Sequence, residues 1–521
     1  MRRRIWIAVI LAVAAVLLAR LFVVTRDLPG TVTAAHFETL RADHPRMRAF
    51  LHRMPKGGDL HTHLSGAVYA ERFLAWGIGN GLCLRRADMA LLPRPDGAPA
   101  GQPCGTDPDT VLLADAVSGP GGQATYDLIV NALSTRWFLP TLRVPSGHDQ
   151  FFSTFGKFNA ATGGSDWDQT ARRIAEMVVD ELKQYDASKV QYVEFMATFF
   201  EGADRQRMTE AIGEVGEPAA MLAALRRAGL DEAAAAKARQ VAAIVAHIEA
   251  LRGCAGDATR PGCGVTFRFI AQVNRNSAPA EVFAQTALSA ALVRAAPGLV
   301  AGLNYVGPED YRVSLRDYRM HMKWIGFLAG ADVPVALHAG ELWLGLVPPS
   351  DLSFHIREAV EVAGARRIGH GTAVGFERDM DGLLAEMRRR GVTIEIALTS
   401  SDVILGVRGR EHPITTYLSA GVPVTLATDD AGVSRIDLTN EYYRGARDHG
   451  LGYGQLKAIA HTALSHSFLS EAEKRSEQAR LDRSLADFER AVIEELTPLE
   501  RLAAVMRAFL PLPGSRPNRS G

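Results

Sequence analysis

Short apolar runs of strand length alternate with longer segments of helical periodicity, and this alternation limits the possible folds most. Amphipathic stretches such as 353–364 and 380–390 separate the later runs. Alternation of this kind predicts parallel βαβ units, and eight units predict an α/β fold closed into a (β/α)₈ barrel of the TIM type. The expected strands are 58–65, 190–198, 265–273, 300–307, 334–341, 366–371, 393–401 and 422–430.

Two insertions interrupt the alternation. Residues 84–122 are rich in Pro, Gly and Asp and are expected to loop over the surface. Residues 201–264 carry an alanine-rich stretch, 231–251, that is expected to form a pair of surface helices. Outside the barrel, residues 31–54 are expected to be a linker that enters a helix, and residues 458–510 to be helices that cover the barrel.

The N-terminus carries a candidate membrane segment. Three consecutive arginines precede an apolar run from Ile5 to Val24, which only Arg20 interrupts. A run of about 20 apolar residues can span a bilayer, and the basic cluster before it favours a cytoplasmic N-terminus. We expect residues 1–30 to be a single-pass anchor in the cell membrane or a cleaved signal peptide, and both place the body outside the cytoplasm, whether tethered, secreted or periplasmic. The remaining domains are a barrel domain over 31–510 and a disordered tail over 511–521.

Charge and cysteine content narrow the class further. Lys and Arg together number 58, as do Asp and Glu, so no basic surface for nucleic acid is expected. The four cysteines form two local pairs, Cys83 with Cys104 and Cys254 with Cys263, and neither pair has zinc-finger spacing. In an oxidising compartment these pairs would form disulfides that close Gly/Pro-rich loops, whereas four free buried thiols are the alternative.

Histidines and carboxylates gather at the ends of the expected strands. A parallel barrel brings the carboxyl ends of its strands to one face, where catalytic residues lie. His61 and His63 are two apart on one strand, so both side chains point to the same side. His338 and Asp429, from other strands, would complete a set of three nitrogens and one oxygen that suits a single zinc ion. The polar residues at strand ends are His61, His63, His338, Glu341, His370, Asp429 and Asp430.

Three of these residues suggest chemistry beside the metal. Glu341 lies three residues past His338 and can reach the same cavity as a proton donor, although a surface carboxylate that caps the next helix is the alternative. His370 lies between two glycines, which suits close approach of the backbone to a ligand, and a core histidine with a backbone partner is the alternative. Asp429 and Asp430 are adjacent carboxylates that repel when buried unless a cation or a proton relieves them.

Taken together, these motifs resemble the adenosine deaminase family, in particular its secreted, growth-factor-related and bacterial members. The resemblance runs in order from about residue 36 to residue 490 and omits only the N-terminal segment, the insertions and the tail. Each motif alone is common, but the ordered set is specific. The stretches that carry it are 54–66 (MPKGGDLHTHLSG), 338–341 (HAGE), 367–371 (RIGHG) and 421–430 (GVPVTLATDD), with weaker support from 300–307 (VAGLNYVG) and 437–442 (DLTNEY).

The resemblance implies zinc-dependent hydrolytic deamination of adenosine or 2′-deoxyadenosine to inosine or 2′-deoxyinosine and ammonia. The partner would be a small purine nucleoside, with one zinc ion per chain. Zinc lowers the pKa of water toward about 7, and a histidine can accept a proton near neutral pH. The implied zinc ligands are His61, His63, His338 and Asp429.

The resemblance also implies roles for single residues around the purine. Glu341 would protonate N1, His370 would take a proton from the attacking water, and Asp430 would orient that water and contact N7. Gly307 would offer its backbone N–H to N3. Residues 151–158, rich in phenylalanine, would form an apolar lid.

Four positions depart from the family's pattern. Ser65 replaces an acidic or amide residue that meets the ribose, so the expected contact of Ser65 with substrate has a changed chemistry. A Cys-Pro-x-Ser-Asn stretch is replaced by Ala-Leu-Thr-Ser-Ser at 397–401. Ala431 replaces a proline, and Asn304 replaces a common aspartate. The metal set is unchanged, whereas the identity of the purine does not follow from the sequence.

Two other functions compete with this interpretation. The first is a mononuclear amidohydrolase that acts on another purine or a cyclic amide; because 300–307 contains no lysine to bridge two metals, one metal is favoured. The second is a membrane-tethered binding protein that has lost catalysis. A cytidine-type deaminase is excluded because no Pro-Cys-x-x-Cys motif is present. The sequence leaves the oligomeric state and the cleavage of the N-terminal segment open.

Overall fold

The computed structural model describes residues 28–97, 102–164, 166–200 and 202–509. Nearly all of the expected anchor or signal segment, residues 1–30, and the whole expected tail, 511–521, therefore lie outside the described residues. Among the helices of the described part, none has the length and apolar character needed to cross a bilayer.

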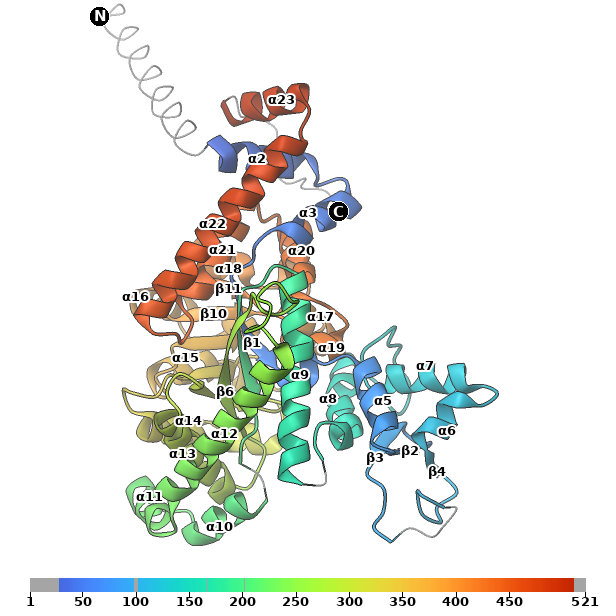
Figure 1. Cartoon of the computed structure of the whole chain (residues 1–521). Helices are drawn as coiled ribbons and strands as arrows, with labels where there is room; N and C mark the ends of the chain where they lie inside the picture. Colours follow the sequence, from blue (N-terminus) through green and yellow to red (C-terminus); the bar gives the residue numbers. More distant parts are fainter. Residues whose placement is uncertain (1–27, 98–101, 165, 201, 510–521) are drawn as a thin grey trace, which may run out of the picture.

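Eight parallel strands form a closed barrel at the centre of the molecule (Figure 1). They are β1 (Gly58–His63), β5 (Tyr192–Ala197), β6 (Thr266–Asn274), β7 (Val300–Val306), β8 (Ala336–Ala339), β9 (Arg367–His370), β10 (Thr393–Ile396) and β11 (Val424–Leu426). Four strands pair in the order β1-β5-β6-β7 and four in the order β11-β10-β9-β8. Bridges from Thr62 to Asp429 and from Leu303 to Val335 join the two sets on both sides. Seven of the eight expected segments contain one of these strands, β6 runs one residue past the eighth, and the barrel they predicted is formed.

Helices between successive strands cover the outside of the barrel. Their ends follow local sequence signals: α16 begins where the Asp379 side chain accepts a hydrogen bond from Gly382 N, and it ends at Gly391, whose φ is +68°. The covering helices are α9 (Trp167–Ala187), α12 (Leu230–Arg252), α13 (Pro279–Ala295), α14 (Arg312–Ala329), α15 (His355–Glu361), α16 (Met380–Arg390), α18 (Ile414–Ser419), α20 (Leu438–His449) and α21 (Tyr453–Ser465).

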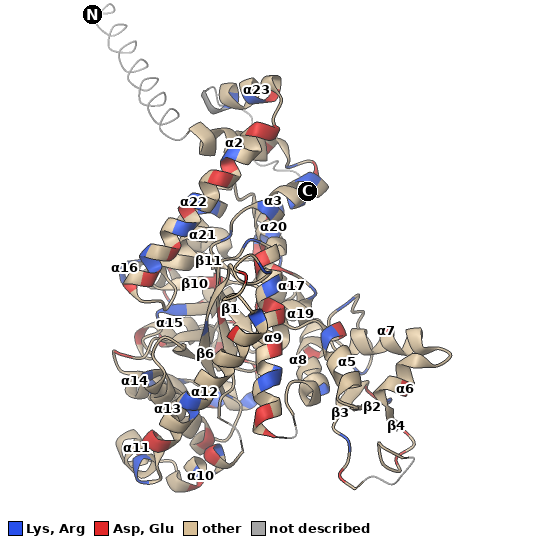
Figure 2. Cartoon of the chain, in the orientation of Figure 1, with Lys and Arg blue, Asp and Glu red and all other residues tan. Residues whose placement is uncertain are grey.

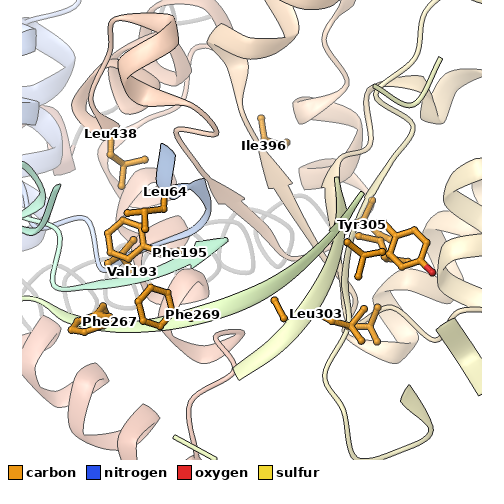
Figure 3. Close-up of a cluster of buried hydrophobic side chains, with 14 of the residues drawn as sticks. Leu64, Val193, Phe195, Phe267, Phe269, Leu303, Tyr305, Ile396 and Leu438 are labelled. Atoms are coloured by element: carbon orange, nitrogen blue, oxygen red, sulfur yellow. The ribbon is translucent and has the colours of Figure 1, made fainter. Parts of the chain in front are cut away.

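The hydrophobic core lies between the strands and this layer of helices (Figure 3). Phe195 on β5 packs on Tyr185 of α9, with ring centroids 6.0 Å apart, and Tyr305 on β7 packs on His321 of α14 at 5.7 Å. Burial of one such side chain stabilises the fold by roughly 1.5–3 kcal/mol. Because strand side chains alternate, Glu194, the neighbour of Phe195, lies on the opposite side, inside the barrel.

The first insertion is more ordered than the surface loop expected for 84–122. It contains a three-stranded antiparallel sheet in the order β3-β2-β4, because Leu84 and Leu91 bury their side chains and pair across β2 and β3. A disulfide joins Cys83 to Cys104, as expected from the local pairing, and the second expected pair, Cys254–Cys263, is also formed. The elements of the insertion and of its flanks are α5 (Ala70–Gly79), β2 (Cys83–Arg85), β3 (Ala90–Leu92), β4 (Thr110–Leu112), α6 (Leu113–Ser118) and α7 (Gly122–Ala132).

The second insertion contains three helices, α10 (Ala203–Ile212), α11 (Pro218–Arg227) and α12, instead of a pair. The alanine-rich stretch 231–251 is one continuous helix, because no glycine or proline occurs between Leu230 and Arg252 and alanine is the strongest helix former. Gly229 and Gly253 bound this helix with positive φ values of +90° and +65°.

The linker expected at 31–54 is also helical. Two helices, α2 (Leu28–Thr39) and α3 (His44–Arg53), occupy this region. The expected C-terminal helices are present as α21, α22 (Glu471–Glu495) and α23 (Pro498–Phe509). Val32 of α2 packs against Leu496, which follows α22, and against Ala504 of α23. This small cluster lies beyond the end of the barrel (Figure 1), and Figure 2 shows both signs of charge interspersed along α22.

We expect the Cys83–Cys104 disulfide to hold the first insertion together. The bond closes a loop with a sequence separation of 21 residues, and closure of a loop of that length stabilises by about 3 kcal/mol. The double variant Cys83→Ser/Cys104→Ser should therefore be cleaved faster within residues 84–122 in limited proteolysis. The Cys254→Ser/Cys263→Ser variant is the matched control; equal resistance of the first variant and the wild type would contradict the prediction.

Candidate functional site

The four expected metal ligands converge at the carboxyl ends of the barrel strands. His61 Nε2 lies 3.0 Å from His338 Nε2 and 3.4 Å from Asp429 Oδ1. His63 Nε2 lies 3.1 Å from His338 Nε2 and 3.2 Å from the same Asp429 oxygen. Side chains from β1, from β8 and from the residue three past the end of β11 thus point to one place.

A second partner fixes the orientation of each imidazole. An acceptor at Nδ1 holds the ring proton there, which leaves the Nε2 lone pair for a metal. Asn304, which departs from the family's usual aspartate, still supplies such an acceptor through its amide oxygen. The pairs are His61 with Glu395 (2.8 Å), His338 with Asn304 (2.9 Å) and His63 with Gln272 (3.4 Å).

A buried charge network lies behind His61. Arg367 Nε is 2.5 Å from Glu395 Oε1, and the other side of the guanidinium contacts Glu194. Burial favours the neutral form of Glu395, but Arg367 and His61 outweigh burial and lower the pKa of that carboxyl. The sequence analysis missed this network, although single charged residues inside otherwise apolar strands were a usable signal.

The geometry of the four ligand atoms fits a metal ion. Zinc–ligand bonds of about 2.0–2.1 Å place neighbouring tetrahedral ligands roughly 3.3 Å apart. The separations of His61 Nε2 and of His63 Nε2 from His338 Nε2 and from Asp429 Oδ1 are 3.0–3.4 Å. His63 also belongs to a second group of possible ligands, with Asp429 and Asp430. Burial opposes a charge on His61, but Asp429 and Glu395 raise the pKa of its ring to about 10. The place where these side chains meet therefore favours a positive charge. Burial, together with His61 and His63, lowers the pKa of His338 and keeps a lone pair on its ring.

The backbone around the cluster is specialised to bring these groups together. His370 and Asp429 have φ values of +65° and +59°, which are unfavourable for residues other than glycine and typical of functional positions. Gly369 lies against the His61 ring, because a Cβ built at position 369 would be 2.4 Å from His61 Cε1. Gly369 thus makes room for the His61 side chain, whereas the approach of the backbone to a ligand, expected at the glycines beside His370, stays a prediction.

The three residues expected to handle protons lie at the same place. His370 belongs to the group in which it, His61, His338 and Asp429 each place one ligand atom within 4.8 Å of the others. Glu341 Oε1 is 3.6 Å from His370 Nε2. Among the described residues, both ring nitrogens of His370, Glu341 Oε1 and Asp430 Oδ1 are buried without a hydrogen-bond partner.

Burial shifts the pKa values of Glu341 and His370 in opposite directions. Burial, and after it Asp429 and Glu309, raises the pKa of Glu341 well above its usual value, so the carboxyl keeps its proton. Burial lowers the pKa of His370 to about 4, so its ring is neutral and can accept a proton. Glu341 is 7% exposed, so it is not the surface helix cap considered as an alternative.

A buried carboxylate holds the turn that carries Glu341. Glu309 accepts hydrogen bonds from Gly340 N (3.1 Å) and Glu341 N (2.8 Å). Arg275 Nη2 donates to His338 O at 2.8 Å, just before this turn. Sequence reasoning missed Glu309 and Arg275, whose roles depend on backbone contacts that no motif records.

The altered stretch 397–401 also supports the site. The strand expected over 393–401 ends at Ile396, and α17 (Leu398–Leu405) begins two residues later, because Glu441 accepts hydrogen bonds from the backbone N–H groups of Leu398 and Thr399. Ser400 Oγ donates to Asp429 Oδ2 at 2.7 Å, so the changed sequence still orients this ligand.

A cavity of about 380 Å³ opens beside the cluster, within the range of roughly 300–1,000 Å³ typical of small-molecule sites. Helix α8 (Gly147–Phe158) forms an apolar wall, which places the expected lid segment 151–158 over the cavity. Ser65 and Gly307, the two expected substrate contacts, line it as well. The other lining residues are His63, Phe151, Phe152, Phe155, Thr198, Gln272, Asn274, Asn276, Val306, Pro308, Tyr311, His338, Glu341, Asp429 and Asp430.

We expect Gly369→Ala to expel the His61 ring from the cluster, because the added methyl group would overlap Cε1 and Nδ1 of that ring. The variant should bind metal at least tenfold more weakly than the wild type, measured as metal content after dialysis against a chelator. Gly375→Ala is the matched control, because a Cβ there meets no atom within 4 Å. Equal metal retention by Gly369→Ala and the control would show that His61 does not need this space.

Comparison with known proteins places the chain in one family. The family model described as "Adenosine deaminase" matches residues 175–483. The adenosine deaminase of Erwinia tasmaniensis is 35% identical over 153 residues, which are 29% of this chain and 42% of that protein. The enzyme of Enterococcus faecalis is 32% identical over 154 residues, with coverage of 29% and 42%. The matched segments thus span about two fifths of these relatives.

Solved structures share the fold at low sequence identity. Arabidopsis N6-mAMP deaminase superposes with a TM-score of 0.53 at 17% identity, over 84% of this chain and 99% of that one. A cog1816 amidohydrolase from Burkholderia ambifaria, with bound Zn, gives 0.50 at 18% identity, over 86% and 95%. These likenesses concern the fold alone. Because the family model covers more than half of the sequence, this chain belongs to the adenosine deaminase family.

Proposed function

We propose that this protein is a zinc-dependent hydrolase that deaminates adenosine or 2′-deoxyadenosine to the corresponding inosine and ammonia. One observation carries the proposal: three imidazole nitrogens and a carboxylate oxygen converge beside a carboxyl group that keeps its proton and an imidazole that lacks one. Family membership supports the reaction class.

His61, His63, His338 and Asp429 would hold the ion. Zinc supplies Lewis acidity and lowers the pKa of a water molecule toward about 7. The separations of the ligand atoms support zinc, as does the zinc in the related amidohydrolase structure. Three of the four side chains come from barrel strands and the fourth lies three residues past β11, and such framework positions hold their geometry better than long loops do.

The protein's own groups move the protons. Glu341 donates its carboxyl proton to purine N1, which draws electrons from C6 and prepares it for attack. His370 accepts a proton from the attacking water as the water oxygen bonds to C6, and passes that proton to the amino group, which leaves as ammonia when the C6–N bond breaks. The proton left on the new C6 hydroxyl returns to Glu341 as the carbonyl forms. Asp430, whose pKa burial raises, can accept a hydrogen bond from the water or share a proton with N7.

The cavity walls hold the purine and exclude water. Phe151, Phe152 and Phe155 of α8 present an apolar face that suits the flat base. Gly307 has a φ of +94° and lines the cavity; its backbone can come close to the ring, and its N–H would donate to N3. Dry walls strengthen the hydrogen bonds made to the base.

The lining favours a nucleoside over a nucleotide. Among the described residues that line the cavity, none is lysine or arginine, and the polar ones away from the metal are Ser, Thr, Asn, Gln and Tyr. Phosphate groups are normally bound by cationic side chains or by several backbone N–H groups. Arabidopsis structures of similar fold are complexes with IMP or GMP, whereas the lining described here offers no cationic side chain to a phosphate.

A protein that only binds nucleosides is the weaker proposal. A site that only binds a nucleoside has no need of a proton donor and a proton acceptor beside its metal ligands. Glu341, His370 and Asp430 lie together at the cluster, and burial favours the protonated form of Glu341 and the neutral form of His370. Their retention supports a site built for a reaction.

We expect Glu341→Gln to lower kcat/KM for adenosine by about 10²–10⁴-fold, because an amide cannot donate an acidic proton to N1. Metal content should stay unchanged, since Glu341 is not a ligand. Ammonia release and metal analysis measure the two effects. Glu489→Gln, at a buried glutamate that binds Tyr453 and Lys457 on the outer helices, is the control. Wild-type turnover by Glu341→Gln would remove Glu341 from the mechanism.

A substrate panel tests the function itself. Zinc-loaded protein should release ammonia from adenosine with a kcat/KM at least 10²-fold above that for AMP, because the lining offers no cation to the phosphate. Adenine and N6-methyladenosine complete the panel. A preference for AMP or for the free base would overturn the nucleoside assignment, and a metal-loaded protein without turnover on any of them would favour the binding protein.

A further inference from the structure

One polar atom in the cavity wall has neither a partner nor a role in the proposed reaction. Asn276 follows β6 and lines the cavity. Its side-chain Nδ2 donates to Pro308 O at 3.0 Å, and its backbone N–H donates to Asn274 Oδ1 at 3.0 Å. Because a carbonyl oxygen can only accept, the first bond fixes the amide so that Oδ1 points away from Pro308. Oδ1 is buried and has no hydrogen-bond partner among the described residues.

This condition matches that of the reacting groups. Glu341 and Asp430 line the same cavity, and each has one carboxylate oxygen, Oε1 and Oδ1, that is likewise buried without a partner. Native proteins pair most of their buried polar atoms, so an unpaired one needs an explanation. Where unpaired atoms share a ligand cavity, the ligand is the natural source of the missing partner.

The other amide oxygens of the cavity are already engaged. Gln272 Oε1 lies 3.4 Å from His63 Nδ1, and Gln272 Nε2 donates to Thr198 Oγ1 at 2.8 Å. Asn274 Oδ1 accepts the backbone N–H of Asn276. Of these three amides from the β6 segment, Asn276 is therefore the one with an acceptor left for substrate.

The place of Asn276 indicates which part of the substrate it meets. A Cβ built on Gly307 would lie 3.0 Å from Asn276 Nδ2, so the two residues are direct neighbours. With Gly307 N–H on purine N3, Asn276 lies along the edge of the ring that carries N3 and N9. The sugar is attached at N9, and in an anti nucleoside the 2′-hydroxyl is the sugar hydroxyl nearest N3.

We propose that Asn276 Oδ1 accepts a hydrogen bond from the ribose 2′-hydroxyl and so makes adenosine a better substrate than 2′-deoxyadenosine. The inference rests on the proposed function and refines it. 2′-Deoxyadenosine offers no donor and leaves the acceptor unpaired in a closed cavity, and a site built to bond a hydroxyl rejects an analogue that lacks it. Sugar recognition thereby moves to the β6 segment, in a chain whose Ser65 departs from the family's usual ribose contact.

The test compares three nucleosides on full-length, zinc-loaded protein. Wild type should show a kcat/KM for adenosine roughly tenfold or more above that for 2′-deoxyadenosine, while 3′-deoxyadenosine, which keeps the 2′-hydroxyl, should group with adenosine. Asn276→Leu has the shape of asparagine without its acceptor. It should bring the ratio of adenosine to 2′-deoxyadenosine close to one, mainly by loss on adenosine.

A conservative variant separates recognition from loop damage. Asn276→Asp keeps an acceptor oxygen but loses the donor to Pro308, so it should retain the preference for adenosine even if overall rates fall. Equal kcat/KM of wild type for the two nucleosides, or an unchanged ratio in Asn276→Leu, would overturn the role of Asn276. Failure of the proposed function has a different signature, namely wild-type protein that releases no ammonia from any of the three nucleosides.

Discussion

The structure depends on a buried cluster of three imidazole nitrogens and one carboxylate oxygen. In this cluster, His61 and His63 each lie within 3.4 Å of both His338 and Asp429. Groups that each present a lone pair repel at this distance unless a cation lies among them. Backbone hydrogen bonds also join these residues: Asp429 N donates to His61 O, and His63 N donates to Asp429 O, both at 2.9 Å. The bonds that close the barrel between β1 and β11 are therefore made by the ligand residues themselves.

Much of the fold could be predicted because burial on both faces leaves a clear pattern in the strands. The eight runs, the polar residues at their ends and the two cysteine pairs are all local features. The linker that enters a helix, expected at 31–54, was confirmed in its helix α3 but missed α2, which is stabilised by α22 and α23 from the far end of the chain. The surface loop expected at 84–122 was wrong for a similar reason, because its short strands form by pairing with one another and not from a local pattern.

The site shows the same division. The residues proposed from motifs as ligands and as proton-handling groups lie close together in the structure, whereas the residues that orient them could not be proposed from motifs. Glu395 and Arg367 are single charged residues in otherwise apolar strands, so the sequence gives no sign that they pair. Glu309 accepts hydrogen bonds from backbone N–H groups, which no side-chain motif records. Such supporting roles depend on three-dimensional neighbours. Asn304 and Ser400 make the complementary point, because both replace family residues and still orient a ligand.

The meeting of β1 and β11 at the ligands has a consequence for how the centre is made during synthesis. His61 and His63 leave the ribosome early, but Asp429 follows only after nearly the whole barrel has been translated. A nascent chain therefore carries an incomplete set of ligands until its last barrel strand arrives. An ion held by all four groups can be bound only after this strand has arrived, when the two ends of the sheet can also join.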